Sequence, residues 1–205
     1  MSNFTYEHAD TKTTLETYEW DNVWWEHTEN QTAKRVCYIG DSISCGIRHI
    51  ATGVSENNIL FDGFGTSKAL DNPFFDSSIA AFLAQQGHRD AVLFNNGLHG
   101  WHLSEEEYEV LYGQRIAFLS NSIGNTPVFI VLTTHVANDP ERQKRVVARN
   151  EAALRVASAY GLPVIDLATK AFEISGLRIQ DGVHFTDGGY TKLAEFIVSQ
   201  IKDII

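Results

Sequence analysis

The chain has 205 residues, of which 43% are hydrophobic and 20% are charged, as expected for a globular protein with a full hydrophobic core. Its 16 Lys and Arg against 26 Asp and Glu give a net charge of -10, which argues against a nucleic-acid partner and against docking to an anionic membrane. We expect one domain spanning residues 1–205, with residues 1–34 as an aromatic-rich N-terminal arm packed on it.

The first residues and the two cysteines indicate the cellular compartment in which the protein is expected. Met1 to His8 include neither the basic nor the apolar region of a secretory signal. The apolar runs also fall short of the ~18 residues that a membrane span needs. Cys37 and Cys45 are too few to staple a secreted fold and are expected to be reduced thiols. The sequence predicts a cytoplasmic protein.

Along the chain, short apolar runs alternate with amphipathic segments. The arm is followed by five expected strands, the second of them weak, at residues 36–39, 59–61, 91–94, 128–132 and 163–165. The runs do not alternate with polar residues, so each strand should be covered on both faces, as in a parallel sheet. Helices are expected at residues 76–86 and 140–160. Two further helices are expected to begin at a capping box at Ser104 and at Thr186. This order predicts an α/β sandwich with a parallel sheet. The N-terminal residues are interpreted as an arm or a short helix packed on the domain.

The residues that follow the expected strands carry the chemistry, because ligands bind at the carboxyl ends of parallel strands. Ser42 stands at a strand-to-helix junction, where a helix N-terminus favours negative charge. A serine hydroxyl needs an imidazole to take its proton, and the imidazole needs a carboxylate to orient it. Asp181 and His184 are three residues apart, which suits one tight turn. These three residues are candidates for nucleophilic catalysis.

Three motifs carry a resemblance to a known family. Gly40-Asp41-Ser42-Ile43 resembles the first block of the SGNH/GDSL hydrolase superfamily, and Asp181-Gly182-Val183-His184-Phe185 resembles its last block. Between them, Asn95-Asn96-Gly97-Leu98 is similar to the third block, although the usual Gly-x-Asn-Asp lacks its glycine and its aspartate here. The resemblance runs from about Arg35 to Ile205 and implies a flavodoxin-like, three-layer α/β/α sandwich with a central, mainly parallel five-stranded sheet.

The resemblance also implies roles for individual residues. Ser42 would be the nucleophile of an ester hydrolase that needs neither metal nor cofactor, His184 its general base and Asp181 the group that orients the base. The oxyanion hole would comprise the N–H of Ser42, a glycine N–H and an asparagine amide. For the glycine we take Gly65 rather than Gly63. For the amide we take Asn95, with Asn96 as the alternative one residue on.

Substrate contacts are expected from the polar loops around this edge. Asn96 and His99 would line the pocket, and Trp101 would stack on a sugar face, although His99 as a surface histidine and Trp101 as a packing residue fit the pattern about equally well. His99 and His102 lack a third ligand at suitable spacing, so no metal is expected.

Three functions are consistent with these residues. The first is a serine esterase that removes short acyl groups, with acetyl expected, from a carbohydrate or another small polar alcohol. The second is a lipolytic or thioester acylhydrolase of the same superfamily. The third is a non-catalytic ligand-binding module on the same fold, which the presence of all three catalytic candidates disfavours. In each case the partner is a small molecule, and the sequence does not specify an oligomeric state.

Overall fold

A six-stranded sheet lies at the centre of the computed structural model, which describes residues 18–205. Its strands are β1 (Asp21–Trp24), β2 (Lys34–Gly40), β3 (Ile59–Thr66), β4 (Ala91–Phe94), β5 (Val128–Val131) and β6 (Val164–Ile165), in the spatial order β1-β3-β2-β4-β5-β6. The pairings among β2 to β6 are parallel, whereas β1 runs antiparallel to β3. The predicted α/β class with a mainly parallel sheet is confirmed.

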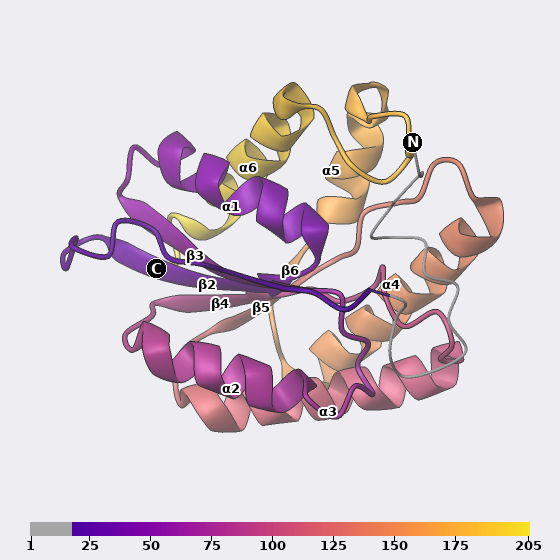
Figure 1. Ribbon diagram of the computed structural model, residues 1–205, viewed down its shortest axis with the longest axis horizontal. Coiled ribbons are helices and arrows are strands. Elements are labelled where there is room, and N and C mark those ends of the chain that lie inside the picture. The colour runs from indigo at the N-terminus through magenta and orange to yellow at the C-terminus, as the bar shows by residue number, and fades with distance from the viewer. Residues whose placement is uncertain (1–17) are drawn as a thin grey trace.

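Helices cover both faces of the sheet (Figure 1). The helices are α1 (Ser42–Val54), α2 (Phe75–Gln86), α3 (Glu105–Ile123), α4 (Pro140–Tyr160), α5 (Leu167–Glu173), the 3-10 turn η1 (Ser175–Leu177) and α6 (Asp187–Ile201). Alternate residues of β2 point to opposite faces: Val36 and Tyr38 pack with α1 and α6, while Cys37 and Ile39 pack with α2 and α3. The predicted three-layer arrangement is therefore present, and β2 to β6 correspond to the five predicted strands.

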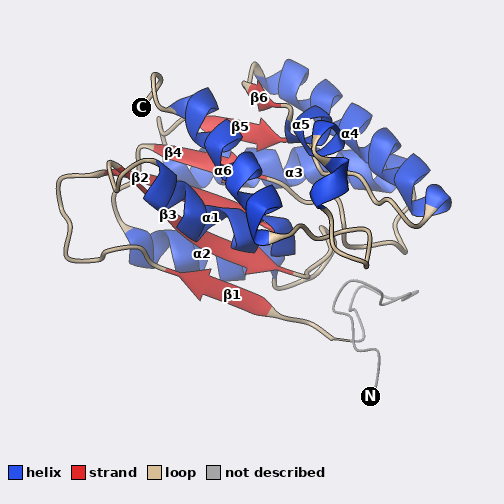
Figure 2. Ribbon diagram, turned by 90° about the horizontal axis from the view of Figure 1, so that it is seen from above, coloured by secondary structure: helices blue, strands red, loops and turns tan. Residues whose placement is uncertain are grey.

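The sixth strand, β1, corrects the sequence prediction. Residues 21–24 of the expected arm pair with β3 in the register Asp21↔Thr66 to Trp24↔Gly63, so they form neither a helix nor a loose extension. Figure 2 shows β1 at the edge of the sheet. All four of its residues are exposed, and an exposed edge strand lacks the apolar run by which a buried strand is recognised. The part of the predicted arm up to residue 17 lies outside the described residues.

Local signals in the sequence set the helix boundaries. Helix α3 begins with the predicted capping box, in which Ser104 and Glu107 each satisfy the other's backbone N–H. Asp139 caps α4 ahead of Pro140, and α4 ends at Gly161 in the left-handed conformation. Helix α5 has seven residues and was not predicted, because so short a segment shows little periodicity. Within residues 18–205, the helices lack the length and apolar character needed to traverse a bilayer.

Candidate active site

Ser42 occupies the first position of α1, directly after β2. The carboxylate of Asp41 caps this helix by accepting the N–H of Ile43 at 3.0 Å. Ser42 thus stands at the N-terminus of α1, where the helix dipole favours negative charge. Gly40 permits the sharp turn from strand to helix, since a Cβ at this position would lie 2.8 Å from the Cβ of Ser44. The predicted strand-to-helix junction is present.

Asp181 and His184 lie on a small hairpin between η1 and α6. The N–H of Ile179 donates to the carbonyl of His184 at 3.0 Å, and the N–H of Thr186 donates to the carbonyl of Leu177 at 2.8 Å. Gly182 turns the chain with a φ of 75°, and a Cβ there would lie 2.7 Å from Asn138. The glycine in this motif is thus required both by its conformation and by the close approach of a neighbouring loop.

The hairpin brings its two polar side chains into line with Ser42. His184 Nε2 lies 2.8 Å from Ser42 Oγ, and His184 Nδ1 lies 2.6 Å from Asp181 Oδ2. The other carboxylate oxygen of Asp181 accepts the N–H groups of Val183 and His184 at 2.8 and 2.9 Å. These hydrogen bonds outweigh the effect of partial burial, so the pKa of Asp181 is lowered and the carboxylate stays ionised. The arrangement has the geometry needed to transfer a proton from the serine to the imidazole.

Arg178, which lies opposite Phe185 in this hairpin, uses its side chain to bind the turn. Its Nη1 donates to the carbonyls of Gly182 and Val183, and its guanidinium carbon lies 4.2 Å from the centre of the Phe185 ring. Its Nε lies 3.1 Å from Nε2 of His135, which follows β5. Burial lowers the pKa of Arg178 to about 10, so the guanidinium remains charged at neutral pH. Sequence reasoning did not find Arg178, because no motif marks an arginine that bonds backbone carbonyls, an aromatic ring and His135.

The two asparagines after β4 point in opposite directions. Asn95 Nδ2 donates to the carbonyl of Val131 at 2.8 Å and to Thr133 Oγ1 at 3.0 Å, on the β5 side of β4. Asn96 Nδ2 instead donates to the carbonyl of Lys68 at 3.0 Å. Since β2 lies between β3 and β4, Asn96 reaches across the end of β2, where Ser42 stands. The Asn95 amide therefore has its two acceptors on the β5 side, whereas the Asn96 amide spans the end of β2 that leads into Ser42.

Gly65 does not fit the predicted role of a backbone donor. Hydrogen-bonded pairs alternate in an antiparallel ladder, and the N–H of Ser67 donates to the carbonyl of Trp20 at 3.1 Å. Two residues earlier, Gly65 is opposite Asn22, so its N–H is directed into β1. A Cβ at Gly65 would lie 2.2 Å from Cys45 Sγ, which explains the glycine by packing. The backbone donor expected here is not supplied by Gly65.

His99 is buried rather than open to a pocket. Only 1% of its surface is exposed, and its ring lies edge-on to Trp20 with the centroids 6.0 Å apart. Its carbonyl accepts a hydrogen bond of 2.6 Å from Arg149 Nη1. His99 was predicted to line the pocket or to lie on the surface. It does neither, because the segment before β1 packs beside it.

Trp101 is engaged by arginine side chains. The guanidinium carbons of Arg149, Arg142 and Arg145 lie 4.6, 5.3 and 5.5 Å from its ring centre. The ring also packs against the apolar cluster that contains α1 and α6. Of the two interpretations of Trp101, packing describes its surroundings better than a free platform for a sugar.

Histidine and acidic residues at this edge form pairs rather than larger clusters. His102 Nε2 lies 2.8 Å from Oδ2 of Asp71, a carboxylate in the loop after β3. A search of residues 18–205 finds no group of three or more His, Cys, Asp or Glu side chains placed to hold a metal ion.

The fold agrees with solved structures of hydrolases. The chain is similar to a member of the lipolytic G-D-S-L family from Veillonella parvula, with a TM-score of 0.65, 18% identity, and coverage of 84% of this chain and 100% of the other. It is also similar to a lipase/acylhydrolase from Enterococcus faecalis, with a TM-score of 0.65, 19% identity, and coverage of 83% and 96%. An acetylxylan esterase from Geobacillus stearothermophilus gives a TM-score of 0.65, 14% identity, and coverage of 84% and 96%.

At these identities the likeness concerns the fold. No protein-family model and no curated protein matches the sequence. The chain has the fold of the SGNH/GDSL hydrolases, as the motifs around Ser42 and His184 predicted.

Proposed function

We propose that this protein is a serine esterase that works through an acyl-enzyme. The observation that carries the proposal is the continuous chain of hydrogen bonds from Ser42 through His184 to Asp181, with heavy-atom distances of 2.8 and 2.6 Å. The three residues come from opposite ends of the chain and meet at the carboxyl edge of the sheet. Solved hydrolases of the same fold support this assignment.

The first half of the proposed reaction forms the acyl-enzyme. Ser42 Oγ attacks the ester carbonyl while its proton moves to His184 Nε2, and Asp181 stabilises the resulting imidazolium. The negative charge that develops on the carbonyl oxygen is stabilised by the Ser42 N–H at the start of α1 and by the Asn96 amide. When the C–O bond of the ester breaks, His184 returns the proton to the departing alcohol.

The second half releases the acid. A water molecule gives a proton to His184 Nε2 and attacks the acyl carbonyl, and the same donors stabilise the second tetrahedral intermediate. Collapse of this intermediate breaks the bond to Ser42 Oγ, which takes the proton back from His184. The products are a carboxylic acid and the free enzyme, and the reaction requires no metal or organic cofactor.

As the substrate we propose a short acyl ester, with acetyl as the acyl group, of a carbohydrate or another small polar alcohol. Polar residues after the strands support this choice, since Thr133 and Thr134 join Asn95 and Asn96 at the edge of the sheet. Several solved structures of similar fold are described as acetylxylan esterases. A chain with only two cysteines, Cys37 and Cys45, fits the reducing cytoplasm, where the proposal places the enzyme.

The alternative is a lipolytic or thioester acylhydrolase, which the similarity to the lipase/acylhydrolase from Enterococcus faecalis supports. A series of nitrophenyl esters with acyl chains of two to twelve carbons separates the two functions. The proposal predicts the highest kcat/KM for the acetyl ester, whereas a maximum at eight carbons or more would favour the alternative. A non-catalytic binding module would hydrolyse none of them.

A further inference from the structure

Residues 66–68, which are the last residue of β3 and the two that follow it, are held by the residues around the start of β1. Thr66 Oγ1 donates to Asp21 Oδ1 at 2.6 Å, and Lys68 Nζ lies 2.6 Å from both oxygens of the same carboxylate. Ser67 exchanges two hydrogen bonds with Trp20: its N–H donates to the carbonyl, and its Oγ accepts the N–H at 2.9 Å. This segment, called the 66–68 loop below, thus gains its order from the edge strand.

The ion pair between Lys68 and Asp21 fixes the lysine side chain. Only 11% of the Lys68 side chain and 33% of the Asp21 side chain are exposed. A nearly buried ammonium group requires a partner, because removing it from water is costly unless its charge is compensated. Lys68 is further tied down by its own N–H, which donates to Thr66 Oγ1 at 3.1 Å. With both ends of the residue held, its carbonyl oxygen has a defined position.

The Lys68 carbonyl is the acceptor for the Asn96 amide at 3.0 Å. The backbone of Asn96 is held separately, because Tyr108 donates its hydroxyl to the Asn96 carbonyl. We propose that Asp21 and Lys68 are positioning residues for the oxyanion hole: the edge strand β1 orients Asn96 toward Ser42 through the 66–68 loop. This inference rests on the proposed function, since it assigns Asn96 to the stabilisation of the oxyanion.

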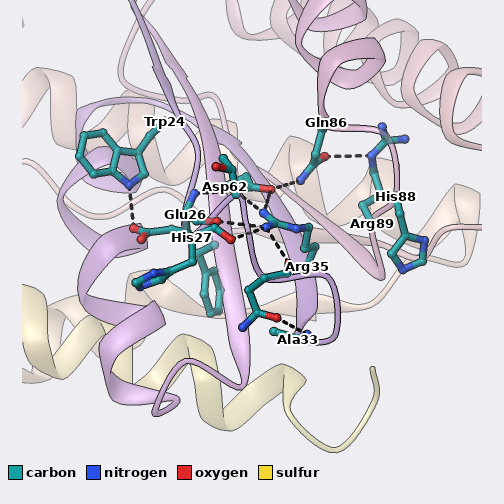
Figure 3. A network of polar contacts seen from close by, with 12 residues as sticks. Trp24, Glu26, His27, Ala33, Arg35, Asp62, Gln86, His88 and Arg89 are labelled. Atoms are coloured by element: carbon teal, nitrogen blue, oxygen red, sulfur yellow. Dashed lines mark hydrogen bonds and ion pairs between the residues drawn. The ribbon is translucent and has the colours of Figure 1, made fainter.

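The other end of β1 is anchored independently, which makes the inference testable without loss of the strand. Asp62 of β3 accepts two hydrogen bonds of 2.9 Å from Arg35 Nη1 and one from the N–H of Glu26, which follows β1 (Figure 3). Trp24 donates its Nε1 to Glu26 at 2.7 Å in the same network. A change at Asp21 should therefore loosen the 66–68 loop while β1 remains in the sheet.

The experiment compares Asp21→Asn and Lys68→Met, each alone and combined with Asn96→Ala, on the full-length protein with a nitrophenyl acetate substrate. Each single variant should lower kcat about tenfold with little change in KM, because the donor acts on the transition state more than on the bound substrate. In the Asn96→Ala background, neither substitution should lower kcat further, because the group that it positions is gone. Lys68→Arg should retain most of the activity by preserving the charge pair.

Lys34→Met serves as the matched control, since it removes a lysine paired with Asp90 at 3.2 Å at the opposite end of β2, and its kcat should be that of the wild type. Melting temperatures identify any variant that fails to fold. If Asp21→Asn fails to fold, Lys68→Met alone tests the inference. Unchanged kcat in both single variants would overturn the inference, as would equal losses in the presence and absence of Asn96. If Ser42→Ala retains the activity, the proposed function itself fails, which is a distinct result.

Discussion

Asn96 crosses the end of β2 to donate its amide to the carbonyl of Lys68 at 3.0 Å, whereas its neighbour Asn95 turns toward β5. This difference decides which of two adjacent asparagines is placed to stabilise an oxyanion. Asn96→Ala should lower kcat by roughly 10²–10³, the usual cost of losing one donor. Asn95→Ala should instead lower stability, because it removes two buried hydrogen bonds. Steady-state kinetics with melting curves on both variants makes the comparison, and the reverse ranking in kcat would restore Asn95 as the donor.

Gly65 provides a test of packing between α1 and β3. An added methyl group would lie 2.2 Å from Cys45 Sγ, so Gly65→Ala should destabilise the protein by roughly 1–3 kcal/mol. Cys45→Ala removes the obstacle, and the double variant should recover most of the lost free energy of unfolding. Urea denaturation of the four proteins measures the coupling. Additive losses would show that the glycine is required for a reason other than this contact.

Arg178 should affect the rate through the hairpin that carries Asp181 and His184. Arg178→Gln removes the charge and the donors to the carbonyls of Gly182 and Val183, so kcat should fall about tenfold while KM changes little. Arg155→Gln is the control, because Arg155 forms an exposed pair with Glu109 and should leave the rate unchanged. If the two variants have equal activity, Arg178 does not position the hairpin.

His135 should make stability depend on pH. Burial and the charge of Arg178 lower the pKa of His135 to about 4 in the folded protein, below its ordinary value of about 6.5. The unfolded chain therefore binds the proton more tightly, and the free energy of unfolding should decrease as pH falls from about 6.5 to about 4. His135→Asn should have a shallower dependence over this interval. Urea denaturation at pH 7, 5.5 and 4.5 compares the two proteins, and parallel curves would contradict the pKa assignment.

The sequence predicted the structure best where one physical requirement determines which residue types a position can hold. Short apolar runs identified β2 to β6, because strands covered on both faces are mostly apolar; the run was weak in β3, where the buried Asp62 interrupts it. Ser42, Asp181 and His184 were placed by motifs whose glycines the turns require. By contrast, β1 could not be recognised, since its four exposed residues carry no apolar pattern.

The residues proposed for the oxyanion hole could not be assigned from the sequence, because their positions depend on contacts between segments that are distant in the chain. The Asn95 amide finds an acceptor in β5 and the Asn96 amide finds one at Lys68 after β3, so the sequence pattern alone could not choose between the two residues. Gly65 matched a motif, yet its N–H is directed into β1, a strand that was not predicted. The contact of Arg178 with His135 and that of Lys68 with Asp21 likewise follow from tertiary structure, since the partners are distant in the chain.

The central claim is that Ser42 is acylated with the help of His184. Incubation with a fluorophosphonate probe, followed by peptide mapping, measures this directly for the wild type, Ser42→Ala and His184→Ala. We expect one adduct on Ser42 in the wild type, none in Ser42→Ala, and a labelling rate reduced by several orders of magnitude in His184→Ala. An adduct on another residue, or labelling of Ser42→Ala at the wild-type rate, would contradict the assignment.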